Sequence, residues 1–317
     1  MPKYRENLPQ LNGGIFLTDG GIETTLIFHE GIDLPYFAAF DLLKDQAGQA
    51  ALRRYYTSHA RIAKEKGCGF ILESATWRAS IDWGAKLGYR EADMAEVNRQ
   101  SIALLTDLRR SFESDRSPVV ISGCVGPRGD GYKVENAMTA AQAQAYHAKQ
   151  VDVFASSEAD MVTAITMTYA EEAIGITRAA KVAGIPVVIS FTVETDGRLP
   201  SGQSLKEAIE TVDAATGNGP AYFMINCAHP DHFEDALKAG ESWVKRIKGL
   251  RANASRMSHA ELDEATELDA GNPAELGQQY CDLQARFGHI TVMGGCCGTD
   301  HRHIEAIGSA CTAAVAA

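Results

Sequence analysis

The stretch His289-Ile-Thr-Val-Met-Gly-Gly-Cys-Cys-Gly-Thr299 joins a short apolar run to two adjacent cysteines, and the earlier stretch Ala221-Tyr-Phe-Met-Ile-Asn-Cys227 ends in a third. Each apolar run has the length of a buried β-strand, and polar or turn-forming residues follow it. If both runs are parallel strands of one sheet, their carboxyl ends lie at the same edge. The sequence therefore predicts that Cys227, Cys296 and Cys297 converge there.

The rest of the chain repeats this pattern, with short β-branched runs alternating with longer amphipathic segments. We count eight runs, at residues 15–18, 70–73, 119–122, 161–165, 187–192, 222–226, 247–252 and 290–293. The clearest helical patterns cover 93–111 and 170–184, the second with Gly184 as its expected C-cap. Eight strands each followed by a helix predict a single (β/α)8, TIM-type barrel that spans residues 1–317 as one domain. The alternative is an open, doubly wound α/β sheet in two halves.

Composition narrows the class of partner. The formal net charge is −11, the pI is near 5.3, and there is no cluster of Lys and Arg long enough to grip phosphates. We therefore expect neither nucleic acid nor a membrane as partner, and small molecules as ligands. We expect no signal peptide, because no apolar stretch follows a basic start. The seven cysteines are widely spaced, which is typical of a cytoplasmic protein whose cysteines remain thiols.

Three converging cysteines suit a zinc ion, Zn²⁺, with one coordination position left open. The competing interpretation is that Cys296 and Cys297 are small buried side chains, since free cysteine packs well in cores. The flanking glycines favour the metal site because they remove bulk and permit unusual backbone angles. The remaining cysteines lack partners and are expected to be structural; they are Cys68, Cys124, Cys281 and Cys311.

Ligand type indicates the chemistry. Three thiolates make zinc a weak Lewis acid, ill suited to producing hydroxide, but able to hold an acceptor thiol as a nucleophilic thiolate. Alkylation of sulfur therefore fits better than hydrolysis, which would need His-rich ligands. A non-enzymatic alternative is a redox sensor in which Cys296 and Cys297 form a reversible disulfide.

Several motifs together resemble the zinc-dependent homocysteine S-methyltransferase family, and the resemblance covers about residues 12–310. They are Asp19-Gly-Gly, Gly123-Cys-Val-Gly-Pro, Ser190-Phe-Thr, Asn226-Cys and Gly294-Gly-Cys-Cys-Gly-Thr. The resemblance implies a (β/α)8 barrel whose zinc is held by the three cysteines. It also implies methyl transfer to homocysteine, giving methionine, from a donor such as S-methylmethionine, S-adenosylmethionine, betaine or methylfolate.

The resemblance also assigns a substrate-binding region. Asp19 corresponds to the family's ligand for the substrate amino group, whereas Ile165 stands where the family commonly has a second carboxylate for it. Glu23, at a position that is usually glycine, is expected to restore the missing charge. The full expected set is Asp19, Gly20, Gly21, Glu23, Thr24, Glu73, Ser74, Thr76, Trp77 and Asn226. The methyl donor and the oligomeric state stay open.

Overall fold

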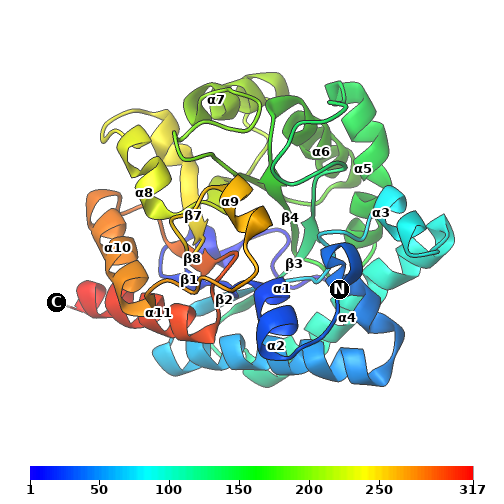
Figure 1. Cartoon of the computed structure of the whole chain (residues 1–317), viewed down its shortest axis with the longest axis horizontal. Helices are drawn as coiled ribbons and strands as arrows, with labels where there is room; N and C mark the ends of the chain where they lie inside the picture. Colours follow the sequence, from blue (N-terminus) through cyan, green and yellow to red (C-terminus); the bar gives the residue numbers. More distant parts are fainter. Residues whose placement is uncertain (317) are drawn as a thin grey trace.

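A computed structural model describes residues 1–316 and shows eight parallel strands that close into a barrel in sequence order, β1 to β8 (Figure 1). The strands are β1 (Phe16–Leu17), β2 (Gly69–Glu73), β3 (Val119–Val125), β4 (Met161–Met167), β5 (Val187–Phe191), β6 (Phe223–Asn226), β7 (Ile247–Ala252) and β8 (Val292–Gly295). Each strand overlaps one of the eight predicted runs. The predicted (β/α)8 barrel is confirmed, and the open-sheet alternative is wrong.

Helices surround the barrel between consecutive strands (Figure 1). The α-helices are α1 (Ile22–Thr24), α2 (Gln46–Lys66), α3 (Ile81–Lys86), α4 (Glu91–Phe112), α5 (Ala140–Ala155), α6 (Ala170–Ala183), α7 (Leu205–Thr216), α8 (Pro230–Phe233), α9 (His259–Glu264), α10 (Pro273–Arg286) and α11 (His301–Ala316). The two predicted helical segments correspond to α4 and α6. Gly184 ends α6 in the left-handed conformation, with φ 69°, as its position as C-cap predicts. Among the described residues, no helix is long and apolar enough to cross a membrane.

The interior of the barrel changes from apolar to polar along the strands. The part near the amino ends of the strands is a closed apolar cluster, made chiefly of Phe16, Ile71, Val120, Met161, Val188, Tyr222, Met224 and Val292. Because side chains alternate along a strand, Glu73 faces the same side as Ile71, and Asn226 the same side as Met224. The apolar layer therefore closes the amino end of the barrel, and functional groups gather at the carboxyl end, as is usual for this fold.

The carboxyl end of the barrel is partly covered by two insertions. The segment after β1 carries α1, and the segment between β7 and α10 carries α9; both lie over the strand ends (Figure 1). Closure of the barrel brings β1 beside β8, where Leu17 pairs with Met293. The loops after these two strands, which carry the first glycine motif and the adjacent cysteines, are therefore neighbours.

Candidate active site

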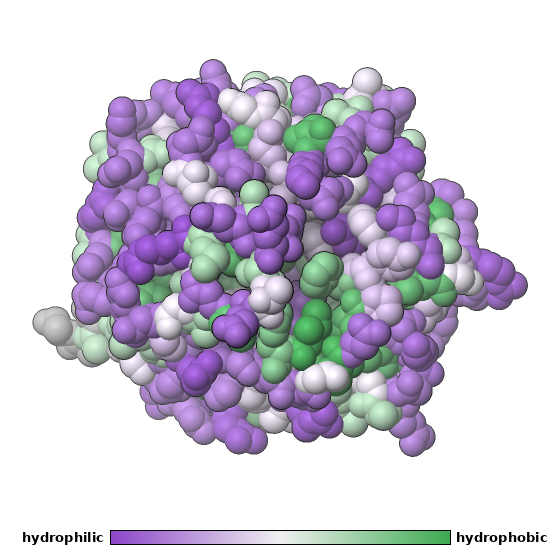
Figure 2. Space-filling view, in the orientation of Figure 1, coloured by the Kyte–Doolittle hydropathy of each residue, from purple (hydrophilic) through white to green (hydrophobic). Residues whose placement is uncertain are grey.

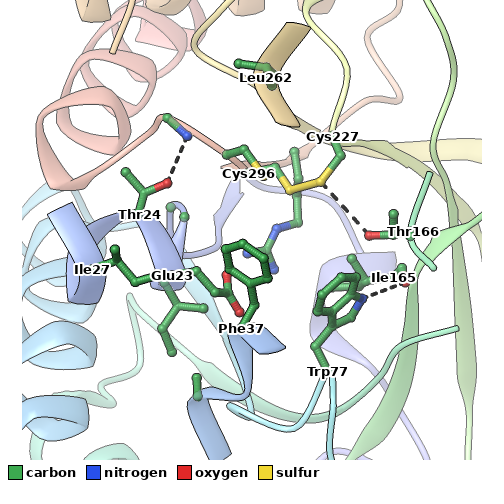
Figure 3. A pocket seen from close by; sticks show the side chains of 18 of the residues that line it. Glu23, Thr24, Ile27, Phe37, Trp77, Ile165, Thr166, Cys227, Leu262 and Cys296 are labelled. Atoms are coloured by element: carbon green, nitrogen blue, oxygen red, sulfur yellow. Dashed lines mark hydrogen bonds between the residues drawn. A yellow bond between two sulfur atoms is a disulfide. The ribbon is translucent and has the colours of Figure 1, made fainter. Parts of the chain in front are cut away.

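The three predicted cysteines converge at the carboxyl ends of β6 and β8. Their sulfur atoms all lie within 4.8 Å of one another. Cys227 and Cys296 are joined by a disulfide (Figure 3), while Cys297 is a free thiol. This corrects two expectations: the cysteines are not all thiols, and the bonded partner of Cys296 is Cys227, not its neighbour Cys297.

The backbone around the cysteines explains the glycine motifs. A Cβ atom on Gly21 would lie only 2.6 Å from the carbonyl oxygen of Cys296, so the two loops can approach this closely only with glycine there. Thr299 donates from Oγ1 to the same carbonyl at 2.7 Å. Cys227 itself has φ 53°, a conformation that non-glycine residues rarely adopt and that is concentrated at functional sites.

Asn226 and Thr166 are hydrogen-bonded to each other beside Cys227. Asn226 Nδ2 donates to Thr166 Oγ1 at 2.9 Å, and its Oδ1 accepts from the Thr166 amide at 3.0 Å. Thr166 also has a positive φ, 66°, and its hydroxyl lies 4.0 Å from Cys227 Sγ (Figure 3). Asn226 is completely buried, so its role in the structure is to fix the conformation of the neighbouring cysteine.

Two loops from opposite sides of the barrel meet beside the sulfurs. Tyr132, in the loop after β3, stacks on His259 at the start of α9, with ring centroids 4.1 Å apart. The Tyr132 hydroxyl lies 3.4 Å from Cys297 Sγ. His259 Nε2 lies 2.6 Å from the carbonyl oxygen of Cys227. The stacked pair therefore contacts both strand ends that carry the cysteines.

The sulfurs face a cavity of about 450 Å³. Eight of the ten expected substrate-binding residues line it: Asp19, Gly20, Gly21, Glu23, Thr24, Glu73, Ser74 and Trp77. Of these, Glu23, Thr24 and Trp77 are labelled in Figure 3. The other two, Thr76 and Asn226, lie behind the cavity wall instead. Thr76 is fully buried and donates to the carbonyl of Cys124 at 2.7 Å, so it holds β2 to β3 rather than contacting a ligand. Cys124, expected to be purely structural, does line the cavity.

A buried ion pair crosses the inner end of the cavity. Arg251 Nη2 donates to Asp19 Oδ1 at 2.6 Å, and Tyr55 donates from its hydroxyl to Asp19 Oδ2 at 2.9 Å. Both oxygens of Asp19 thus have partners, and its charge is balanced by a guanidinium. Family resemblance assigns Asp19 to a substrate amino group, but in this protein its first partner is Arg251.

Two further carboxyls in the cavity are desolvated. Burial raises the pKa of Glu73 to about 7, against the lowering effect of nearby Arg251. Burial likewise raises the pKa of Glu23 to about 7. Glu23 points into the cavity, as predicted from its place in the loop after β1 (Figure 3). An incoming cation would favour the ionised form of either group.

Trp77 forms one wall of the cavity and is held in place by its polar edge. Its indole Nε1 donates to the carbonyl of Ile165 at 3.2 Å (Figure 3). The guanidinium of Arg78 lies between the rings of Trp77 and Trp83, 3.9 and 3.8 Å from their centroids. Trp83 is absent from the cavity lining, so a bound substrate can contact only Trp77 of these two rings.

The outer rim of the cavity combines apolar and acidic side chains. Phe28 and Phe37 line it and are about half exposed, and apolar side chains gather on this face of the molecule (Figure 2). Several carboxylates also belong to the lining: Asp130, Asp263, Glu267 and Asp269. Such a rim attracts small cations and repels anions.

Sequence reasoning missed four residues of this site. Arg251 could have been noticed, because an arginine inside a buried strand needs a charged partner. Tyr132 and His259 carried no usable signal, because they lie in a loop and at the start of a loop-borne helix. Thr166 stands where the fourth strand of the family commonly ends in Glu-Thr, but the sequence assigned it no role.

Comparison with known proteins places the whole barrel in one family. A profile described as homocysteine S-methyltransferase matches residues 16–311. Homocysteine S-methyltransferase 4 from Zea mays is 23% identical, and the match covers 94% of this chain and 90% of that protein. Selenocysteine Se-methyltransferase from Brassica oleracea var. italica is 26% identical, with coverage of 93% and 88%.

Solved structures with the same fold include the homocysteine methyltransferase MmuM from Escherichia coli. Its metallated form superimposes with a TM-score of 0.76 at 18% identity, covering 96% of this chain and 99% of that one. Its oxidized form gives a TM-score of 0.75 at 20% identity, with coverage of 93% and 95%. At these identities the structural match concerns the fold.

Proposed function

Because the chain belongs to the homocysteine S-methyltransferase family, we propose that it transfers a methyl group from a small cationic donor to the thiol of homocysteine, giving methionine. The observation that carries this proposal is the set of three cysteine sulfurs within 4.8 Å of one another on the wall of a ligand-sized cavity. The family match is independent support, because it covers almost the whole barrel.

The donor set fits a zinc ion. Cys227, Cys296 and Cys297 would hold it as thiolates, which requires that the disulfide between Cys227 and Cys296 be reduced. Three thiolates leave one position for an exogenous ligand. When bound, the ion supplies positive charge that keeps an acceptor thiol deprotonated at neutral pH.

The cavity suits the charge changes of the reaction. The acceptor thiolate attacks the donor methyl carbon, a sulfur–carbon bond forms, and the bond from that carbon to the sulfonium sulfur or ammonium nitrogen breaks, leaving a neutral group. An anion and a cation become neutral products, so a poorly solvated site favours the transition state. Trp77 and Ile165 give this region apolar walls, and the acidic rim attracts the cationic donor.

A donor panel tests the proposal. Reduced, zinc-loaded protein is incubated with homocysteine and either S-methylmethionine, S-adenosylmethionine, betaine or 5-methyltetrahydrofolate, and methionine is measured by mass spectrometry. We expect turnover with at least one sulfonium or quaternary ammonium donor and none with the folate. Zinc-loaded protein that makes no methionine with any cationic donor would overturn the proposal.

A further inference from the structure

The inner wall of the cavity carries a buried cation with unused hydrogen-bonding capacity. Arg251 donates from Nη2 to Asp19 and from Nε to the carbonyl of Gly295 at 3.2 Å, but its Nη1 has no partner. Its side chain is 7% exposed. A buried guanidinium nitrogen without an acceptor is destabilising, so a ligand that supplies an acceptor there is bound more tightly.

A buried carboxyl group that lacks a hydrogen-bond donor for one of its oxygens lines the same cavity. Glu73 Oε1 accepts from Thr163 Oγ1 at 2.9 Å, whereas Oε2 has no partner. Glu73 is 5% exposed. The two groups are near enough for Arg251 to lower the pKa of Glu73, yet they form no direct ion pair among the described contacts.

Together these groups form a matched pair of binding positions. One needs an anionic acceptor, the other a cationic donor, and both belong to the cavity that the three sulfurs face. A molecule carrying a carboxylate, an ammonium and a thiol would satisfy both in a single bound pose. An α-amino acid has the first two groups on one carbon.

We propose that Arg251 and Glu73 recognise the zwitterionic head of the acceptor amino acid, with Arg251 Nη1 donating to its α-carboxylate and Glu73 Oε2 accepting from its α-ammonium. The inference rests on the proposed function and deepens it, because it makes both charges of the acceptor a condition of binding. Asp19 then acts indirectly: it holds Arg251 in place instead of contacting the substrate.

The pair gives selectivity among thiols. A thiol lacking the ammonium leaves Glu73 unpaired, and a thiol lacking the carboxylate leaves Arg251 unpaired. Sites built to pair a buried polar group discriminate strongly against analogues that lack its partner. Simple thiols are therefore poor acceptors even though their sulfur is equally reactive.

The test compares homocysteine with two truncated acceptors, 4-mercaptobutanoate and 3-aminopropanethiol, in wild type and variants. We expect Glu73→Gln to lower kcat/KM for homocysteine about tenfold or more, and for 4-mercaptobutanoate less than about twofold. Arg251→Lys keeps a cation for Asp19 and should lower kcat/KM for homocysteine about tenfold, with little change for 3-aminopropanethiol. The control Glu65→Gln, on the exposed face of α2, should change neither.

Binding measurements separate failure of this inference from failure of the proposed function. Calorimetry with L-methionine and 4-(methylthio)butanoate reports recognition of the head group without turnover, and we expect L-methionine to bind at least about tenfold more tightly. Equal affinity for L-methionine and 4-(methylthio)butanoate would overturn the inference. So would a loss of kcat/KM in Glu73→Gln that is the same for homocysteine and 4-mercaptobutanoate. Neither result would contradict methyl transfer itself. Selective methionine binding without methyl transfer would sink the proposed function alone. Thermal unfolding and zinc content of each variant identify misfolding.

Discussion

Arg251 Nη2 lies 2.6 Å from Asp19 Oδ1, so a residue of β7 is paired with one that follows β1, 232 positions earlier. These strands are not neighbours, because β8 lies between them. The pair therefore connects the carboxyl ends of β7 and β1 across β8, the strand that precedes the adjacent cysteines. Truncating either partner leaves a buried charge uncompensated, which is strongly destabilising.

The cysteine ligands give the first prediction. Replacing Cys227, Cys296 or Cys297 with Ser should remove most bound zinc and nearly all methyl transfer, because each supplies one of only three sulfurs. Cys281→Ser, on the partly exposed face of α10, is the matched control and should retain both. Metal analysis of reduced protein measures the outcome, and full zinc in Cys227→Ser would refute the assignment.

Desolvation of Glu73 gives a prediction about stability and pH. Its pKa of about 7 in the folded protein exceeds its ordinary value of 4.5, so its contribution to stability is greatest below about pH 4.5 and is lost as the pH rises through 7. Glu73→Gln does not titrate and should raise Tm at pH 8 by roughly 1.5–4.5 °C, corresponding to about 1–3 kcal/mol. The difference should shrink at pH 5. Thermal unfolding at both pH values measures it, and an unchanged or larger gain at pH 5 would contradict the assignment.

The hydroxyl of Tyr132 gives a third prediction. Tyr132→Phe removes the group 3.4 Å from Cys297 Sγ but keeps the stacking on His259. Groups that support metal ligands typically contribute about 10-fold or more to affinity, so zinc affinity should fall by about that factor. Competition with a chelator measures it. Tyr146→Phe, whose hydroxyl bonds to Ser80 outside the cavity, should leave zinc affinity unchanged.

The glycine contacts give a fourth prediction. Gly21→Ala places a methyl group 2.6 Å from the carbonyl of Cys296, which must shift the loop that carries the adjacent cysteines. We expect reduced zinc content and at least about tenfold lower turnover, since small displacements of reacting groups are costly. Gly288→Ala has no atom within 4 Å of the added methyl group and should behave like wild type. Equal behaviour of the two variants would show that the loop tolerates the shift.

The fold could be predicted because apolar β-branched runs and helical periodicity are local properties of the chain. The strand limits differed by up to three residues: β3 continues to Val125 beyond residue 122, β4 continues to Met167 beyond residue 165, and β8 begins at Val292 rather than residue 290. The convergence of the cysteines followed from the same pattern, since parallel strands end at one edge of the sheet.

The rest of the site depends on contacts that no local pattern encodes. Tyr132 reaches Cys297 only because its loop folds back across the barrel, and Asp19 is occupied only because Arg251 lies opposite. Thr76 resembled a ligand-binding hydroxyl by position, yet strand alternation and a turn bury it behind the wall. Loop paths and side-chain pairing are tertiary properties, and they decided these roles.

The stacking of Tyr132 on His259 constrains how this protein could be redesigned. The two rings come from separate loops, after β3 and after β7, and each loop holds a strand end that bears a cysteine. Exchanging either loop alone for that of a relative would separate the rings and disturb a sulfur. The two loops must therefore be exchanged together if the positions of the sulfur atoms are to be kept.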